Sequence, residues 1–373
     1  MSNSACLNCI DLSEPDIHKS VSLLKQACED SGFFYVVNHG ISQELVDEVL
    51  AQSKRFFDLP LKEKMKLLRN KKHKGYTPIL DETLDPDNQG IARRATTSAS
   101  RFPRTTPVPR SHSLAQTVGL LQKQVFLHFP TTELIFDNFI CLLQSYVSHV
   151  DFLFAFSEVV KSISKIIALA LDLNAEFFIK PEILGEPIAT LRLIHYSVFP
   201  DEVSNPEKGI YGAGAHSDYG LITLLLTDEV LGLQICKDKD AQTQVWEYVP
   251  PMKGAFIVNL GDMLERWSNC IFRSTLHRVI VNGQERYSVA FFVEPNHECV
   301  VECLPTCKSA ANPPKFPPVT CSAYLSQRYK ETYADLSVHS ENRVFPPVTC
   351  SAYLSQRYKE THADLSVYSG NGV

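Results

Sequence analysis

The stretch HSDYGLITLLL, residues 216–226, decides how the rest of the chain is interpreted. It places a histidine and an aspartate directly before Leu221–Leu226, an aliphatic run bounded by Gly220 that predicts a short buried strand. Residues two apart in extended backbone point to the same side. We therefore expect His216 and Asp218 to direct an imidazole and a carboxylate toward one point, where both could bind a metal ion.

A His-x-Asp pair alone is a weak signal, because the pattern occurs three times in this chain, at His149, His216 and His362. His362 lies in a duplicated tail whose other copy has Tyr333 at the same place, so that pair is not needed there. No strand is expected after His149. Only His216 is followed by further residues that complete a recognisable site.

Those further residues lie on two later strand-like runs. His277 begins the run His277–Val281, and Arg286-Tyr287-Ser288 opens the run Val289–Val293. Two histidines and one carboxylate form the three-ligand set that holds ferrous iron and leaves positions open for a bidentate co-substrate and oxygen. The arginine offers a planar fork for a carboxylate, and Ser288, on the same strand face, can add a hydroxyl.

Short strands with Gly, Pro, Asp and Asn between them predict an antiparallel sandwich or barrel in the second half of the chain. The seven expected strands are Ala189–Phe199, Gly220–Leu226, Leu231–Ile235, Val245–Val249, Phe256–Leu260, His277–Val281 and Tyr287–Val293. The first half predicts a helix over Ile17–Ala27 that ends at Gly32, a strand at Phe33–Val37, a helix from Ser42 to near Pro60 and a helix over Ser157–Leu173.

Composition excludes several classes of protein. The 373 residues carry a net charge of −6, so there is no basic excess with which to bind nucleic acid or an anionic membrane surface. The most apolar stretch, Phe139–Phe156, contains His149 and Asp151, which argues against a membrane span. The N-terminus lacks the features of a secretory signal, so we expect the 11 cysteines to be reduced thiols in the cytoplasm.

The chain divides into four expected segments. Residues 1–90 form a helical and strand region, 91–156 follow no clear pattern, 157–310 hold the β core, and 311–373 form a tail. Within the tail, residues 316–338 recur at 345–367 with a single change. Two copies are too few for a solenoid, so a tandem duplication explains them better.

The ordered set of motifs resembles the plant-type 2-oxoglutarate- and Fe(II)-dependent dioxygenases, the isopenicillin N synthase-like family. Two further stretches support the likeness, GFFYVVNHGI at 32–41 and NLGD at 259–262. The resemblance covers about residues 10–90 and 157–330. It implies an α+β fold with a mainly β core, a double-stranded β-helix (jelly roll) with flanking N-terminal and C-terminal helices. It also implies that oxidative decarboxylation of 2-oxoglutarate drives hydroxylation or desaturation of a small organic substrate by O2.

The resemblance further implies roles for individual residues. His216, Asp218 and His277 would be the catalytic iron ligands, and Arg286 and Ser288 would bind the distal carboxylate of the co-substrate 2-oxoglutarate. Tyr196 stands where a tyrosine of the family contacts 2-oxoglutarate. Its surroundings, Ile194-His195-Tyr196-Ser197, lack the asparagine usual in the family, and His195 is either a core residue or faces the substrate. Ascorbate would serve as reductant for a cytoplasmic monomer that binds neither nucleic acid nor membrane.

Two other functions remain open from the sequence. Because residues 91–156 usually border the substrate pocket in this family and show no resemblance here, the chain could be a catalytically impaired binding protein of the same fold. The two histidines and the aspartate could also hold zinc in a metal hydrolase. Arg286 and Ser288 favour the dioxygenase, since a hydrolytic zinc site needs no second fork for a carboxylate.

Overall fold

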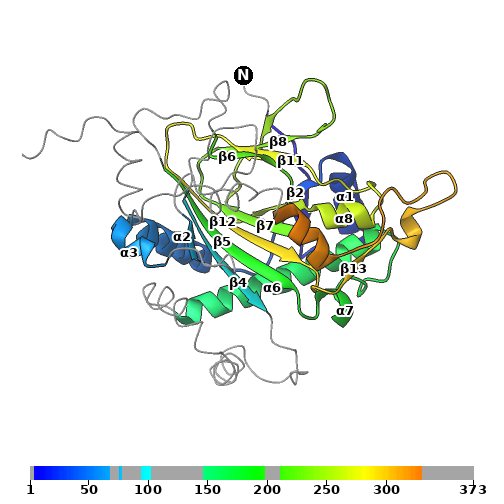
Figure 1. Cartoon of the computed structure of the whole chain (residues 1–373), viewed down its shortest axis with the longest axis horizontal. Coiled ribbons are helices and arrows are strands. Elements are labelled where there is room, and N and C mark those ends of the chain that lie inside the picture. The colour runs from blue at the N-terminus through cyan, green and yellow to red at the C-terminus, as the bar shows by residue number, and fades with distance from the viewer. Residues whose placement is uncertain (1–3, 68–74, 78–93, 102–145, 198–210, 330–373) are drawn as a thin grey trace, which may run out of the picture. The chain divides into compact units, whose positions relative to one another are not determined.

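Two sheets build the core of the computed structural model, which describes residues 4–67, 75–77, 94–101, 146–197 and 211–329 (Figure 1). All of these residues belong to one compact unit, residues 1–332. The larger sheet has the strand order β1-β2-β10-β7-β12-β5-β4-β3, and the smaller has the order β6-β11-β8-β9. A further pair joins β13 and β14.

The strands of the larger sheet are β1 Cys9–Asp11, β2 Phe33–Val37, β3 Gly75–Thr77, β4 Arg94–Arg101, β5 Ile188–Tyr196, β7 Ile222–Thr227, β10 Phe256–Leu260 and β12 Arg286–Glu294. Those of the smaller sheet are β6 Ala213–His216, β8 Leu233–Cys236, β9 Glu247–Tyr248 and β11 Leu276–Val279, while β13 is Val300–Val301 and β14 is Val319–Thr320. The helices are α1 Ile17–Asp30, α2 Gln43–Asp58, α3 Leu61–Met65, α6 Tyr146–Ala170, α7 Pro181–Leu184 and α8 Asp262–Trp267, with a 3-10 turn at Pro305–Cys307 and further helix at 321–329.

The two sheets face each other across a buried cluster. Tyr35, Ile194 and Ile257 come from the larger sheet, and Ile235 and Val279 come from the smaller one. Figure 1 shows β6, β8 and β11 on one side of this interior and β5, β7 and β12 on the other. The opposite face of the larger sheet packs on helices through a second cluster. This arrangement confirms the jelly-roll prediction, a mainly β core with flanking helices.

Local residues explain where α1 and α2 begin and where α1 ends. The carboxylate of Asp16 accepts a hydrogen bond from His18 N, and the Ser42 hydroxyl accepts one from Leu45 N, which are ordinary N-terminal caps. After α1 the chain turns at Gly32 with φ +64°, where a Cβ would lie 2.0 Å from the Arg273 carbonyl oxygen. Only glycine fits there, and the predicted end of the helix is confirmed.

All seven strands expected in the second half are present, with shifts at their ends. The pattern missed β4 and β6, because the polar RATTSASR has no apolar residue larger than alanine and the small AGAH has neither a β-branched residue nor Tyr, Phe or Trp. The helix expected from Ser157 begins earlier, at Tyr146. Both β4 and the start of α6 lie within 91–156, the segment for which we expected no clear pattern. Residues 102–145 and the second tail copy at 345–367 fall outside the described residues.

No helix in the described part of the chain has both the length and the apolar character needed to cross a membrane. The cysteines in the same part are free thiols, Cys6 and Cys9 included.

A buried carboxyl group, that of Glu294, lies at the C-terminal end of β12. Glu294, at the end of β12, is 5% exposed, and its Oε2 has no hydrogen-bond partner among the described residues. Burial, with a smaller contribution from the charge of Asp218, raises the pKa of Glu294 from 4.5 to about 8. The folded protein therefore keeps a proton that the unfolded chain releases as the pH passes the ordinary value.

This proton makes stability depend on pH. The contribution of Glu294 is fully present below pH 4.5 and is lost as the pH rises through about 8, because the unfolded chain binds fewer protons in that window. We expect the stability of Glu294→Gln relative to the wild type, measured without metal, to rise by on the order of 4 kcal/mol from pH 5 to pH 8.5, since one unit of pKa shift corresponds to about 1.4 kcal/mol. Urea unfolding at the two pH values measures the difference, with exposed Glu298→Gln as control. A constant difference between the Glu294 variant and the wild type would contradict the assignment.

Candidate metal centre

Three polar side chains converge at the end of the smaller sheet. His216 ends β6 and His277 lies in β11, and the two are direct partners in the antiparallel register. Nε2 of His277 is 3.6 Å and Nε2 of His216 is 3.9 Å from Oδ1 of Asp218. Nitrogen and oxygen atoms of the three residues all lie within 4.8 Å of one another. The structure thus brings together the three residues that the sequence singled out.

Each histidine is oriented by its own strand. Nδ1 of His216 lies 2.7 Å from the Gly214 carbonyl oxygen, and Nδ1 of His277 lies 3.1 Å from the Thr275 carbonyl oxygen. A carbonyl oxygen only accepts, so in each ring Nδ1 donates and carries the hydrogen. Nε2 is then the atom that each ring offers to a metal, the arrangement usual for histidine ligands.

Asp218 is held by different means from those expected. It lies beyond the end of β6, so side-chain alternation along a strand does not orient it. Instead, Oδ2 accepts hydrogen bonds from Thr223 Oγ1 at 2.6 Å and Asn259 Nδ2 at 2.7 Å. Burial by itself raises the pKa of Asp218, but attraction to His277 and His216 and these hydrogen bonds outweigh it, so the pKa lies below its ordinary value. The carboxylate is therefore charged, with Oδ1 directed at the imidazoles.

The donor set fits ferrous iron. Two imidazole nitrogens and one hard carboxylate oxygen, all on one side of a common centre, are the ligands of mononuclear non-haem iron, and they leave positions for other ligands. Zinc accepts the same atoms, so the three residues alone do not choose between the metals.

A second polar group lies on β12 and β5 in the same interior. Arg286 is the register partner of Tyr196, and its guanidinium carbon lies 5.0 Å from the centre of the tyrosine ring. Nε of Arg286 donates to the Val230 carbonyl oxygen at 3.2 Å, whereas Nη1 has no partner among the described residues. Ser288 is fully buried, and its Oγ also lacks a partner there. At Gly232 a Cβ would lie 3.0 Å from Arg286 Cδ, so the missing side chain leaves room for the arginine.

Buried donors without acceptors are costly, and the large majority in proteins are satisfied. Arg286 and Ser288, two residues apart on one strand, offer a charged fork and a hydroxyl to the same side. A carboxylate from a small molecule would satisfy both. The residues present therefore fit the co-substrate that the sequence motifs suggest.

His195 belongs to the other face of the sheet. Its ring stacks on Tyr287 with centroids 4.4 Å apart and an angle of 6°, and it lies 5.4 Å from Phe57 of α2. Since neighbouring residues in a strand face opposite sides, Tyr196 points inward where His195 points toward α2. Of the two roles left open for His195, the structure supports the core residue.

Sequence reasoning missed the residues that support the metal-ligand candidates. Thr223 and Asn259 were noted only as parts of a strand and of the NLGD stretch. Phe33 was noted only within a strand, yet its ring makes an edge contact with His277 at 5.5 Å. A polar residue at an inward position of an otherwise apolar strand is the signal that could have identified Thr223 and Asn259.

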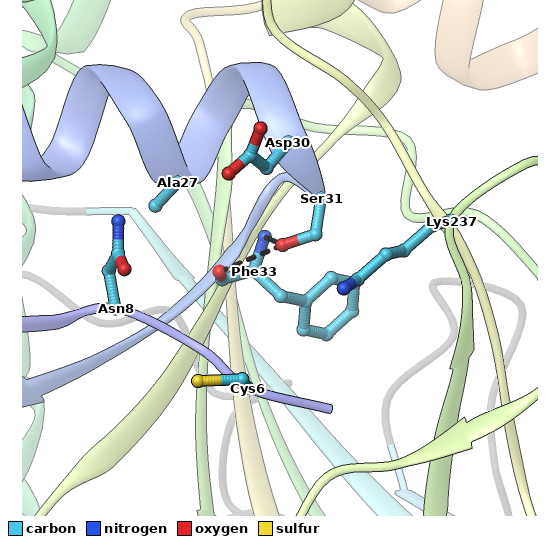
Figure 2. A pocket seen from close by; sticks show the side chains of 7 residues that line it. All are labelled: Cys6, Asn8, Ala27, Asp30, Ser31, Phe33 and Lys237. Carbon is cyan, nitrogen blue, oxygen red and sulfur yellow. Dashed lines mark hydrogen bonds between the residues drawn. The ribbon is translucent and has the colours of Figure 1, made fainter. Parts of the chain in front are cut away.

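Phe33 also lines a pocket of about 200 Å³ (Figure 2). Its backbone carbonyl accepts a hydrogen bond from the Ser31 hydroxyl at 3.2 Å. The pocket is lined by Cys6, Asn8, Ala27, Asp30, Ser31, Phe33 and Lys237. Phe33 thus lines this pocket and also contacts the His277 ring.

Comparison with known families gives two matches along the chain. Residues 7–116 match a family described as non-haem dioxygenase in morphine synthesis, N-terminal. Residues 188–295 match the 2OG-Fe(II) oxygenase superfamily. The second range contains all six candidate site residues: Tyr196, His216, Asp218, His277, Arg286 and Ser288.

Relatives and solved structures agree with these matches. The chain is 43% identical to azadirone synthase of Melia azedarach over 333 residues, covering 88% of this chain and 93% of that protein. It is also 43% identical to kihadalactone A synthase of Citrus sinensis, with the same shares covered. A crystal structure of JOX2 with 2OG, Fe and JA has a TM-score of 0.64 and 26% identity, covering 88% of this chain and 86% of that one.

These findings confirm the resemblance, and none of them favours a catalytically impaired binding protein. The relatives are matched over nearly their full length, so the comparison concerns whole enzymes. The chain therefore belongs to the plant-type 2-oxoglutarate- and Fe(II)-dependent dioxygenases, enzymes that couple oxidation of 2-oxoglutarate to hydroxylation or desaturation of a small organic substrate.

Proposed function

We propose that His216, Asp218 and His277 bind the Fe(II) of this enzyme and that Arg286 and Ser288 bind the distal carboxylate of 2-oxoglutarate. One observation carries the proposal: three metal-binding side chains with donor atoms within 4.8 Å share an interior with two buried donors that lack acceptors. A zinc hydrolase would use the first group and leave the second without a role. The pairing of both groups supports the dioxygenase site.

The residues act by binding and orienting. The two imidazoles and the carboxylate of Asp218 hold the metal by one side, and Arg286 fixes the co-substrate by charge at its far end. Tyr196 packs on the guanidinium and limits its movement. When bound, Fe(II) supplies the redox chemistry by which O2 converts 2-oxoglutarate to succinate and CO2 and oxidises the substrate.

The substrate belongs to the same proposal. Two relatives that are 43% identical are named for the synthesis of azadirone and kihadalactone A. We propose substrates of the same chemical kind as the precursors of these two compounds. Ascorbate serves as reductant, and the enzyme acts as a cytoplasmic monomer, in keeping with the free thiols of the described part.

The metal ligands can be tested without substrate. Under anaerobic conditions we expect 2-oxoglutarate and Fe(II) together to produce a visible absorbance band on the protein, which neither produces alone. His216→Ala removes one of three ligands, and we expect the band to disappear. Absence of the band from folded wild-type protein would contradict the proposed site.

The proposed role of Arg286 predicts a selective loss of 2-oxoglutarate binding. We expect Arg286→Met to weaken 2-oxoglutarate binding about 100-fold or more, because removing one partner of a buried charge pair costs about 3 kcal/mol or more. Metal affinity stays within a few-fold, since Arg286 is not among the metal-ligand candidates. Titration of each ligand by calorimetry measures the two affinities, with exposed Arg273→Met as control. Equal loss of both ligands would point to a folding defect instead.

The substrate proposal predicts coupled turnover. We expect precursors of azadirone or kihadalactone A to increase succinate formation well above the rate without substrate. Product analysis by mass spectrometry should show an added oxygen atom or the loss of two hydrogen atoms. Stimulation only by chemically unrelated compounds would exclude this substrate class.

A further inference from the structure

Within the described residues, two side chains donate hydrogen bonds to the Asp218 carboxylate, and both bonds end on the same oxygen. Thr223 Oγ1 and Asn259 Nδ2 each donate to Oδ2, at 2.6 and 2.7 Å. Oδ1 instead faces Nε2 of His277 and of His216. The two oxygens of the carboxylate therefore have different partners. Oδ2 accepts hydrogen bonds from Thr223 and Asn259, and Oδ1 faces the two histidines.

The two donors are neighbours by strand register. Asn259 of β10 lies directly opposite Thr223 of β7, and on its other side Asn259 lies opposite Phe33 of β2. Tyr35 and Ile257, two residues away on their strands, belong to the core between the sheets, so this row faces the interior. Phe33 contacts the His277 ring. One row across three strands thus touches two of the three metal-ligand candidates.

Oδ2 has no capacity left for a metal. A carboxylate oxygen offers about two lone-pair directions, and two short hydrogen bonds occupy both. Bidentate binding of a metal by Asp218, a side chain that is 6% exposed, would have to compete with both bonds. Hydrogen bonds to charged groups are stronger than neutral ones, so this competition favours a single metal bond through Oδ1.

From this geometry we infer that Thr223 and Asn259 are positioning residues that restrict Asp218 to one metal bond, through Oδ1. The inference rests on the proposed function of Asp218 as an iron ligand. Its consequence is for the co-substrate: a second carboxylate oxygen on the metal would take a position that 2-oxoglutarate or oxygen needs. The pair thereby keeps the metal open while leaving Asp218 fully charged.

The test is metal binding by full-length protein, followed through the visible absorbance of Co(II) in place of iron. Thr223→Val preserves the shape of the side chain and removes its hydroxyl, and Asn259→Leu removes the amide at similar volume. We expect each to weaken Co(II) binding about 10–100-fold and to change the shape and intensity of the Co(II) spectrum. We also expect the Co(II)-saturated variants to bind 2-oxoglutarate several-fold more weakly. Thr223→Ser restores the hydroxyl and should restore both readouts.

A matched control comes from the same strand and face. Thr227 of β7 donates to the Asp228 carbonyl oxygen and does not contact Asp218, so Thr227→Val should leave the Co(II) spectrum unchanged. Circular dichroism of each metal-free variant checks folding, and if Asn259→Leu does not fold, Thr223→Val and Thr223→Ser decide alone. Folded Thr223→Val with the affinity and spectrum of the wild type overturns the inference. If wild-type protein does not bind Co(II), or Asp218→Ala binds it equally well, the proposed function fails instead.

Discussion

A charged carboxylate at the centre of a protein must be compensated from several directions, and Asp218 is 6% exposed. Its compensation comes from His216 at the end of β6, His277 in β11, and Thr223 and Asn259 in β7 and β10. The first two strands belong to the smaller sheet and the last two to the larger. The site therefore exists only when both sheets are formed and in register, which ties the chemistry to the fold.

The alternation of strand faces lets one pair of strands serve two purposes. Arg286 and Tyr196, register partners on β12 and β5, face the interior with the candidate site. Their chain neighbours Tyr287 and His195 stack on each other on the opposite face, against Phe57 of α2. The packing of α2 thus holds in place the strands that present the arginine, and a one-residue slip of either strand would exchange the two faces.

Five of the six candidate site residues, His216, Asp218, His277, Arg286 and Ser288, could be named from short local motifs, whereas Tyr196 followed only from the family resemblance. His216 and Asp218 precede an apolar strand, and Arg286 opens another. The supporting residues were out of reach, since Asn259 and Thr223 meet only through the pairing of β10 with β7, a register that no local pattern specifies. His216 and Asp218 converge as expected, but the long-range hydrogen bonds that hold the Asp218 carboxylate could not be seen in the local pattern.

The division of the Asp218 carboxylate also explains how the site can be formed before its ligands bind. Thr223 and Asn259 satisfy Oδ2 in the protein alone, so the carboxylate is oriented without a metal. What remains unsatisfied lies where the co-substrate would bind: Nη1 of Arg286 and Oγ of Ser288 lack acceptors among the described residues. Such groups lower the stability of the unliganded fold and raise the affinity for a dicarboxylate, because binding relieves their unmet interactions without first reorganising them. The unliganded protein is therefore less stable than it would be with these groups paired, but its binding site already has the geometry that the ligand requires.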